Sequence, residues 1–294
     1  MTDKAGVLYV VATPIGNLGD ITERALAVLR EVALIAAEDT RSARRLLTHF
    51  GIRGQLRSYH EHNEGAGAQA LLKVLEGGQD VALVSDAGTP LISDPGFVLV
   101  RAARSRGIRV VPIPGANAAI CALSAAGLPS DRFLFLGFPP RTSAKCRDWL
   151  ARLAGEPGTL IFYESGKRAA RTLGDLAAAL GGERKAVVAR ELTKHFETFL
   201  SGTLGALADR LASDAEQRLG ELVLLVEGAG EVEQAAEGQE EERVLAILAA
   251  ELPPRQAAAL AARLTGGSKN RLYRLALAMG GRKAGASAER SGPR

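Results

Sequence analysis

The chain has 294 residues, of which 47% are hydrophobic and 4% aromatic, and it carries a formal net charge of +4. This length predicts two domains with an appendage, and the many Ala, Leu, Val and Gly residues are typical of helices packed on a parallel sheet. Apolar runs are shorter than the ~18 residues of a membrane helix, and the N-terminus lacks a signal-peptide pattern, so we expect a soluble, cytoplasmic protein. Its two cysteines and four scattered histidines disfavour a metal site.

Apolar strands and amphipathic helices alternate through the first half of the chain. Thr22 should cap the first helix, and Thr40 or Ser42 should start a basic helix that ends at Gly51. The segment His60-Glu61-His62 could in principle hold a metal, but a polar turn is favoured. This alternation predicts an α/β domain with a largely parallel sheet, with strands at 7–12, 34–37, 81–84 and 110–114 and further helices at 66–76 and 97–106.

Three of these strands end in loops that contain Gly and Pro, at 13–20, 85–96 and 114–118. Right-handed crossovers bring all the strand ends to one edge of the sheet, where open α/β sheets bind ligands. The loop 85–96 holds two Gly, two Pro and two Asp, more than a simple connection needs, which favours binding. Ser93 or Asp94 should also cap the following helix. Neither a dinucleotide-binding fingerprint nor a P-loop is present.

A second α/β unit follows, with strands expected at 133–136, 159–163, 186–189 and 221–227 and a helix at 169–180. We expect a layered domain of mixed strand direction. The predicted boundaries are 1–115 for the first domain, 116–228 for the second, 229–242 for an acidic linker, 243–280 for a basic helical domain and 281–294 for a disordered tail.

The C-terminal part has an uneven charge. From Pro253 onward there are nine Lys and Arg residues against Glu289 alone, whereas 228–252 holds seven Glu against Arg243. Helices at 243–252, 255–264 and 268–279 are expected, the last two forming a helix-turn-helix-like hairpin. The basic excess indicates a polyanionic partner, although such a tail can also be merely solubilising.

Eight motifs follow one another over most of the first 228 residues: TPIGNLGDIT, AEDTR, SYHEHNE, SDAGTPLISDPG, PIPGANA, FLGFPPR, FYES and ARELTKHFE. In this order they resemble the family of ribosomal RNA small subunit methyltransferase I, within the tetrapyrrole methylase superfamily. The resemblance implies a cleft between two α/β domains that binds S-adenosylmethionine, and 2′-O-methylation of a cytidine ribose in the decoding region of 16S rRNA. It also implies the 30S ribosomal subunit as partner and a homodimer. Where the family usually has Pro-His after FYES, this chain has Gly166-Lys167, so Lys167 would replace the histidine.

The resemblance places the cofactor against residues of both domains. For Phe138 and Tyr163, core packing is an equally good interpretation. The expected cofactor-binding residues are Pro14, Ile15, Asp86, Gly88, Thr89, Ala116, Asn117, Phe138, Tyr163, Ala189 and Leu222.

Transfer of a methyl group to a ribose hydroxyl would benefit from a base, because that hydroxyl is barely acidic at neutral pH. The candidates at strand ends are Asp39, Glu164 and Glu191. Lys167, Arg190 and Lys194 could stabilise developing negative charge. Each of the six could instead form a structural ion pair, which for any single residue is the favoured interpretation.

Basic residues on predicted helices could contact RNA phosphates. Such residues can also form a plain solvated face, and the C-terminal helical pair could equally serve dimer contacts. The candidates are Arg41, Arg44, Arg45, Arg141, Lys145, Lys269, Arg271 and Arg274.

Two other functions are compatible with these patterns. One is methylation of a tetrapyrrole or another small acceptor, which the basic helices and tail disfavour. The other is a cofactor-regulated RNA-binding or assembly protein without catalysis.

Overall fold

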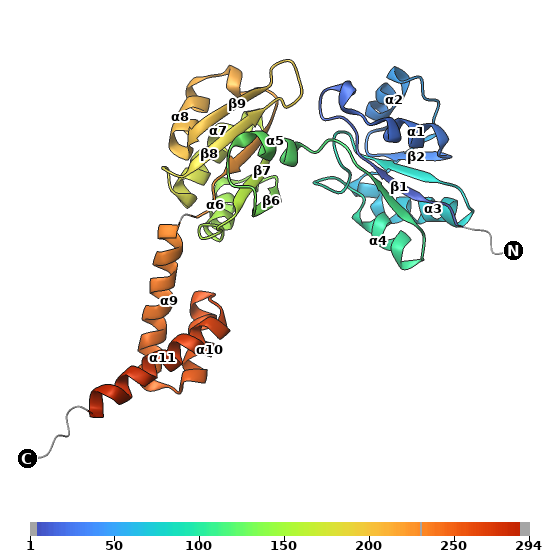
Figure 1. The fold of residues 1–294 in the computed structure, drawn as a ribbon. Coiled ribbons are helices and arrows are strands. Elements are labelled where there is room, and N and C mark those ends of the chain that lie inside the picture. Colours follow the sequence, from blue (N-terminus) through green and yellow to red (C-terminus); the bar gives the residue numbers. More distant parts are fainter. Residues whose placement is uncertain (1–4, 230, 289–294) are drawn as a thin grey trace, which may run out of the picture. The chain divides into compact units, whose positions relative to one another are not determined.

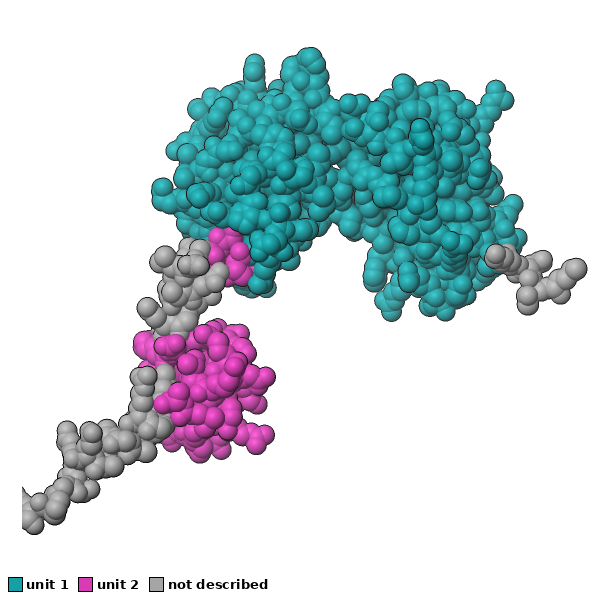
Figure 2. All heavy atoms as spheres, viewed as in Figure 1, with its two compact units in different colours: residues 1–153, 158–227 teal, residues 154–157, 228–294 magenta. Residues whose placement is uncertain are grey.

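The computed structural model describes residues 5–229 and 231–288, with the side chains of 62, 231–240 and 279–288 left out. The chain divides into two compact units, 1–153 with 158–227 and 154–157 with 228–294 (Figure 2). Within the described ranges, none of the helices combines the length and the apolar character that crossing a bilayer requires.

The first sheet of unit 1 has five parallel strands in the order β3-β2-β4-β1-β5. The predicted parallel α/β arrangement is therefore confirmed. Its strands are β1 (Leu8–Val11), β2 (Leu34–Ala37), β3 (Leu56–Ser58), β4 (Val81–Val84) and β5 (Val110–Ile113), and its helices are α1 (Glu23–Glu31), α2 (Thr40–His49), α3 (Glu64–Glu76) and α4 (Phe97–Ser105), with short 3-10 turns at Leu18–Asp20 and Glu61–Asn63.

Helices cover both faces of this sheet (Figure 1). Along β4, Val81 and Leu83 pack with α3 and α4, whereas Ala82 and Val84 pack with α1 and α2. Burial on both faces explains why the strands are continuous apolar runs and not alternating ones.

Side chains next to the first turn cap helices α1 and α2. Thr22 Oγ1 accepts a hydrogen bond from Ala25 N at 3.1 Å, as predicted. Helix α2 begins at Thr40, one of the two predicted starts, and its cap is Asp39, whose Oδ1 accepts from Arg41 N at 2.8 Å.

The start of α4 corrects a capping prediction. The expected caps Ser93 and Asp94 are both wrong, because the helix begins after Gly96, whose φ of 140° suits only glycine. The Gly96 N–H is instead bound by Glu64 Oε1 of α3 at 2.7 Å. A cap that comes from a helix 32 residues away has no local signal.

The second sheet of unit 1 has the order β6-β7-β10-β8-β9, with β6 and β7 parallel and the other pairs antiparallel. The mixed direction predicted from the sequence is thus confirmed. Its elements are the strands β6 (Phe133–Gly137), β7 (Thr159–Ser165), β8 (Lys185–Arg190), β9 (Thr198–Thr203) and β10 (Glu221–Val226), the helices α5 (Ala118–Ala126), α6 (Ser143–Ala151), α7 (Gly166–Leu180) and α8 (Leu204–Ser213), and a 3-10 turn at Glu216–Arg218.

Helix α5 marks the point where the chain passes from the first sheet to the second. Its residues Ala119, Ala122 and Leu123 pack against Ile161 and Val223 of the second sheet. The short segment between β5 and α5, residues 114–117, therefore connects the two α/β halves of unit 1 and delivers one of the predicted ligand loops.

Unit 2 consists of α9 (Glu231–Glu251), α10 (Pro254–Thr265) and α11 (Lys269–Ala288). Its own core contains Leu245, Ala257, Ala261 and Leu272. Two expectations change here. The predicted linker 229–242 is helical from Glu231 onward, since Glu, Gln and Ala are good helix formers. Helix α11 continues through Ala288, into the predicted tail, whose residues 289–294 lie outside the described part.

Candidate active site

The three predicted ligand loops meet at the carboxyl edge of the first sheet. Thr13 and Gly88 form an antiparallel bridge, with Thr13 N to Gly88 O at 2.9 Å and Gly88 N to Thr13 O at 3.0 Å. Thr89 Oγ1 donates to Ala116 O at 3.0 Å. Hydrogen bonds therefore join the loops that follow β1, β4 and β5, as the parallel topology predicted.

A cavity of about 370 Å³, hereafter the cleft, opens beside these loops within unit 1. This volume is within the range of small-molecule sites. Both α/β halves line it, through Ile15, Glu38, Asp86, Ala87, Gly88, Thr89, Ile92, Ser93 and Asp94 from the first and Asn117, Ala118, Phe138, Tyr163, Glu164, Ser165, Leu192, Lys194, Glu221, Leu222 and Val223 from the second.

Two glycines let the halves approach closely at the cleft. A Cβ atom on Gly16 would lie 2.5 Å from Lys194 Cγ, so this loop packs directly on the segment after β8. Gly137 has a φ of 64°, and a Cβ there would lie 3.1 Å from Ser93 Oγ. Neither position has room for a side chain without movement of its neighbour.

Two aromatic rings line the cleft from the second half. The Tyr163 hydroxyl accepts a hydrogen bond from Ala119 N at 3.2 Å, and burial raises the pKa of Tyr163. The Phe138 ring lies 5.7 Å from the Tyr163 ring and is 58% exposed. Core packing therefore does not account for Phe138.

Carboxylates gather on the opposite wall. Asp86 Oδ1 accepts from Asp39 N at 3.0 Å, which joins the ends of β4 and β2. Burial, with the charges of Asp94 and Asp86, raises the pKa of Glu38 to about 7. Burial also raises the pKa of Asp94 to about 6, with a contribution from Asp86. Glu38 and Asp94 were absent from the predicted site. Their positions directly after β2 and inside the loop 85–96 were the available signals.

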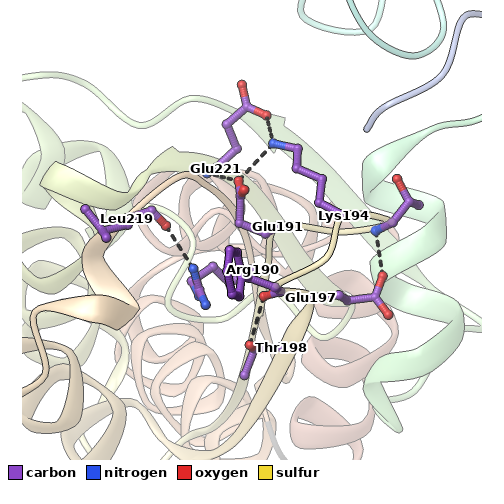
Figure 3. A network of polar contacts seen from close by, with 9 residues as sticks. Arg190, Glu191, Lys194, Glu197, Thr198, Leu219 and Glu221 are labelled. Carbon is purple, nitrogen blue, oxygen red and sulfur yellow. Dashed lines mark hydrogen bonds and ion pairs between the residues drawn. The ribbon is translucent and has the colours of Figure 1, made fainter. Parts of the chain in front are cut away.

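The segment after β8 carries a network of polar contacts (Figure 3). Lys194 Nζ lies between Glu191 Oε1 at 2.8 Å and Glu221 Oε2 at 3.0 Å, and Glu191 Oε1 also accepts from Glu221 N. Although burial opposes both shifts, these hydrogen bonds lower the pKa of Glu191 and raise that of Lys194. Arg190 is 9% exposed, and its Nη1 donates to Leu219 O at 3.5 Å.

Glu164 is enclosed and fully engaged. Its side chain has 0% exposure, accepts from Thr172 Oγ1 at 2.7 Å and pairs with Arg168 at 3.1 Å. The same guanidinium donates to Pro139 O at 2.8 Å. Glu164 therefore anchors, through Arg168, the loop that carries Phe138.

The remaining catalytic candidates lie outside the cleft lining. Asp39 caps α2 and pairs with Arg41 at 2.8 Å, and its hydrogen bonds with Arg41 lower its pKa to about 2. Lys167 is exposed on the first turn of α7. Of the six predicted residues, only Glu164 and Lys194 line the cleft.

Most of the predicted cofactor residues do line the cleft. The exceptions are Pro14, which lines a neighbouring cavity, Ala116, whose carbonyl holds Thr89, and Ala189, which is buried in the core of the second sheet. Those that line it are Ile15, Asp86, Gly88, Thr89, Asn117, Phe138, Tyr163 and Leu222.

Two more cavities lie along α2. The α2 cavity, about 510 Å³, is lined by Thr40, Arg41, Arg44, Arg45, Thr48 and His49. The side cavity, about 310 Å³, is lined by Pro14, Ser42 and Arg45 among others, and it shares Ile15, Asp86 and Ala87 with the cleft. Arg45 lines both, so a basic side chain borders the α2 cavity and the side cavity that adjoins the cleft.

The other predicted RNA-binding residues are distributed over both units. Arg141 and Lys145 are exposed in unit 1, and Lys269 is exposed in unit 2. Arg271 forms an ion pair with Glu241, and Arg274 Nε donates to Asn270 O at 3.4 Å. The charge of Arg271 is thus already partnered within unit 2.

Comparisons with known proteins give consistent matches. The tetrapyrrole (corrin/porphyrin) methylase family matches residues 7–208, and the RsmI C-terminal HTH domain matches 235–280. Ribosomal RNA small subunit methyltransferase I of Pseudomonas aeruginosa is 58% identical over 93% of this chain and 98% of its own length. Ribosomal RNA small subunit methyltransferase I of Escherichia coli O157:H7 is 55% identical over 94% of this chain and 96% of its own length.

Solved structures share the fold at low identity. The methyltransferase CobJ aligns with a TM-score of 0.57 and 20% identity over 76% of this chain and 95% of its own. The cobalt precorrin-4 methyltransferase CbiF aligns with a TM-score of 0.54 and 15% identity over 75% of this chain and 94% of its own. Both alignments support the fold alone.

Proposed function

Because this chain belongs to the ribosomal RNA small subunit methyltransferase I family, we propose that it methylates rRNA, with S-adenosylmethionine as donor. In finer detail, the acceptor is the ribose 2′-hydroxyl of a cytidine in the decoding region of 16S rRNA within the 30S subunit. The observation that carries this proposal is the cleft in which the three loops of the first sheet face Phe138 and Tyr163.

The residues of the cleft fit the donor chemically. S-adenosylmethionine has positively charged sulfonium and ammonium groups, and Asp86 and Asp94 supply negative charge in a partly enclosed site. Ile15, Leu222 and the two aromatic rings supply apolar surface. When bound, the donor supplies an electrophilic methyl group.

Positioning is the main contribution of these side chains to the transfer. Holding the acceptor oxygen in line with the methyl carbon and sulfur is worth on the order of 7 kcal/mol or more. The bridge between Thr13 and Gly88 and the hydrogen bond from Thr89 to Ala116 fix the donor side. The side cavity, which shares a wall with the cleft, takes the acceptor nucleotide.

Methylation is tested with the purified chain, labelled S-adenosylmethionine and 30S subunits from cells that lack the endogenous enzyme. We expect label in a 2′-O-methylcytidine of 16S rRNA after nucleoside analysis. Label on a porphyrin precursor instead would indicate a tetrapyrrole methylase, and donor binding without turnover would indicate an assembly protein. The Gly88→Val variant is the negative control, because Gly88 has a φ of 87° and a Cβ there would lie 3.2 Å from Ile15 Cγ2.

RNA contact at α2 is tested by the salt dependence of 30S binding. Each phosphate contact contributes about 0.7 to 0.9 to the slope of log K against log salt. Arg44→Ala and Arg45→Ala should each lower that slope by one such contribution, since both side chains are exposed in the α2 cavity. Arg104→Ala, an exposed arginine on α4, is the matched control and should leave it unchanged. Equal slopes in all variants would remove α2 from the RNA interface.

A further inference from the structure

The carboxylates that the sequence indicated as bases are all engaged elsewhere. Asp39 is held by Arg41, and Glu191 by Lys194. Glu164 has no exposed side-chain surface and is held by Arg168 and Thr172. A carboxylate in such contacts is stabilised in its charged form or shielded from substrate, so none of the three is suited to take a proton from an acceptor hydroxyl.

Glu38 has the opposite surroundings. It follows β2 directly, and the parallel register pairs Ala37 with Val84, so Glu38 lies beside the start of the loop 85–96. It is half-buried and lines the cleft. Among the residues that the structure describes, neither a hydrogen-bond donor nor a cation is bound to its carboxylate.

The charged groups around Glu38 are mostly negative. Asp94 and Asp86 of the loop 85–96 are the main ones, followed by the neighbouring Asp39 and by Glu61. On the far wall of the cleft, Glu164 is neutralised by Arg168, and Lys194 is shared between Glu191 and Glu221. Burial and these like charges favour the protonated form of Glu38 and raise its pKa to about 7.

We propose that Glu38 is the general base of the methyl transfer and takes the proton of the acceptor hydroxyl. This rests on the proposed function. The acceptor oxygen forms its bond to the methyl carbon as the bond between that carbon and sulfur breaks. The electron pair of the broken bond stays on sulfur, and the hydroxyl proton moves to the Glu38 carboxylate. Asp94 is a positioning residue that raises the proton affinity of Glu38.

The first test is Glu38→Gln, which keeps the shape of the side chain and removes its basicity. The single-turnover rate of 30S methylation at saturating donor should fall by about 100-fold or more, the usual contribution of a general base. The dissociation constant for S-adenosylmethionine, measured by calorimetry, should stay within about threefold of the wild-type value. Glu31→Gln is the matched control, because Glu31 is exposed, does not line the cleft and is not among the charges around Glu38, and its rate should be unchanged.

The second test follows the carboxyl group itself. In difference infrared spectra of the wild-type protein, a carboxyl band should titrate near pH 7 and be missing in Glu38→Gln. Asp94→Asn should move this titration to lower pH, and the acidic limb of the rate profile should move with it. Because the carboxyl band is measured in the wild-type protein, its titration can be followed even if a variant folds poorly.

Three results would overturn the role of Glu38: an unchanged rate in Glu38→Gln, a loss that lies only in donor affinity, or a carboxyl band that titrates near pH 4. Failure of the proposed function would look different, because the wild-type protein itself would then leave 16S rRNA unlabelled.

Discussion

At the scale of single residues, the partners of a carboxylate decide its role. Glu164, Glu191 and Asp39 all occur at strand ends, and each is bound by a cation, which is the structural interpretation that the sequence favoured for any single one of them. Arg168 lies in the first turn of α7, forms an ion pair with Glu164 and also donates to Pro139 O. Glu38, whose carboxylate has no partner in the described part of the chain, is the residue next to Asp39, so strand-end position alone could not separate the two.

The buried pair of Glu164 and Arg168 leads to a stability prediction. Glu164→Gln should lower the free energy of unfolding by about 3 kcal/mol, because it leaves a largely buried guanidinium without its counter-charge. Urea denaturation measures this. Glu227→Gln is the matched control, since the 3.8 Å pair of Glu227 with the exposed Lys185 should contribute less than about 1 kcal/mol. Similar losses in both variants would contradict the anchoring role.

Glu38 also predicts how stability depends on pH. Its pKa in the folded protein is about 7, above the ordinary value of 4.5, so the folded state favours the protonated form. The contribution of Glu38 to the free energy of unfolding is fully present below pH 4.5 and is lost as the pH rises through about 7. Urea midpoints between pH 5 and pH 8 should therefore fall more in the wild type than in Glu38→Gln. Parallel curves for the two proteins would show that Glu38 titrates normally.

At the scale of elements, glycine sets how closely the loop after β1 approaches the segment after β8. Gly16→Ala should displace Lys194, because the added Cβ would lie 2.5 Å from its Cγ. We expect the affinity for S-adenosylmethionine to fall on the order of tenfold, about 1.4 kcal/mol. Gly19→Ala in the same loop is the control, since its Cβ would contact only Asn17 Oδ1 at 3.2 Å. Calorimetry on both variants decides, and equal affinities would contradict this packing.

The loops of the first sheet and all of its strands except β3 could be predicted, because burial on both faces makes each of these strands an apolar run with a clear end. Strand β9 was missed, since its six residues contain Gly202 and bury only Leu200. The cap of α4 by Glu64 and the approach of Gly16 to Lys194 join residues far apart in sequence, so no local pattern reports them. The cleft was therefore predictable as a meeting of loops, and the sequence favoured ion pairs at Asp39, Glu164 and Glu191, whereas the acidic wall was not predicted.

At the scale of the whole molecule, unit 2 has its own core, and its part from Pro253 onward has a basic excess that is partly used internally. Arg271 is paired with Glu241, whereas Arg255, Arg263, Lys269 and Arg274 are exposed. Unit 2 can therefore add affinity for a polyanion without taking part in donor binding.

Removal of unit 2 tests this division. A chain that ends at residue 229 should bind S-adenosylmethionine with unchanged affinity and bind 30S subunits more weakly, with a smaller salt slope. Filter binding over a salt series measures the slope. Lys269→Ala in the full chain should reproduce part of the change, whereas Arg271→Ala should alter it less because its charge is paired. A slope that does not change on truncation would assign unit 2 a role other than RNA contact.

The bridge between Thr13 and Gly88 connects two loops whose strands run in parallel through two backbone hydrogen bonds, and Thr13 Oγ1 adds a third to Gly88 O at 3.4 Å. These bonds lie within the protein and hold the two loops together without ligand contacts, so binding does not have to order them. Replacements of side chains that line the cleft should then leave the association rate nearly constant and act on the dissociation rate. Stopped-flow measurements on such variants would show a spread in dissociation rates and a common association rate.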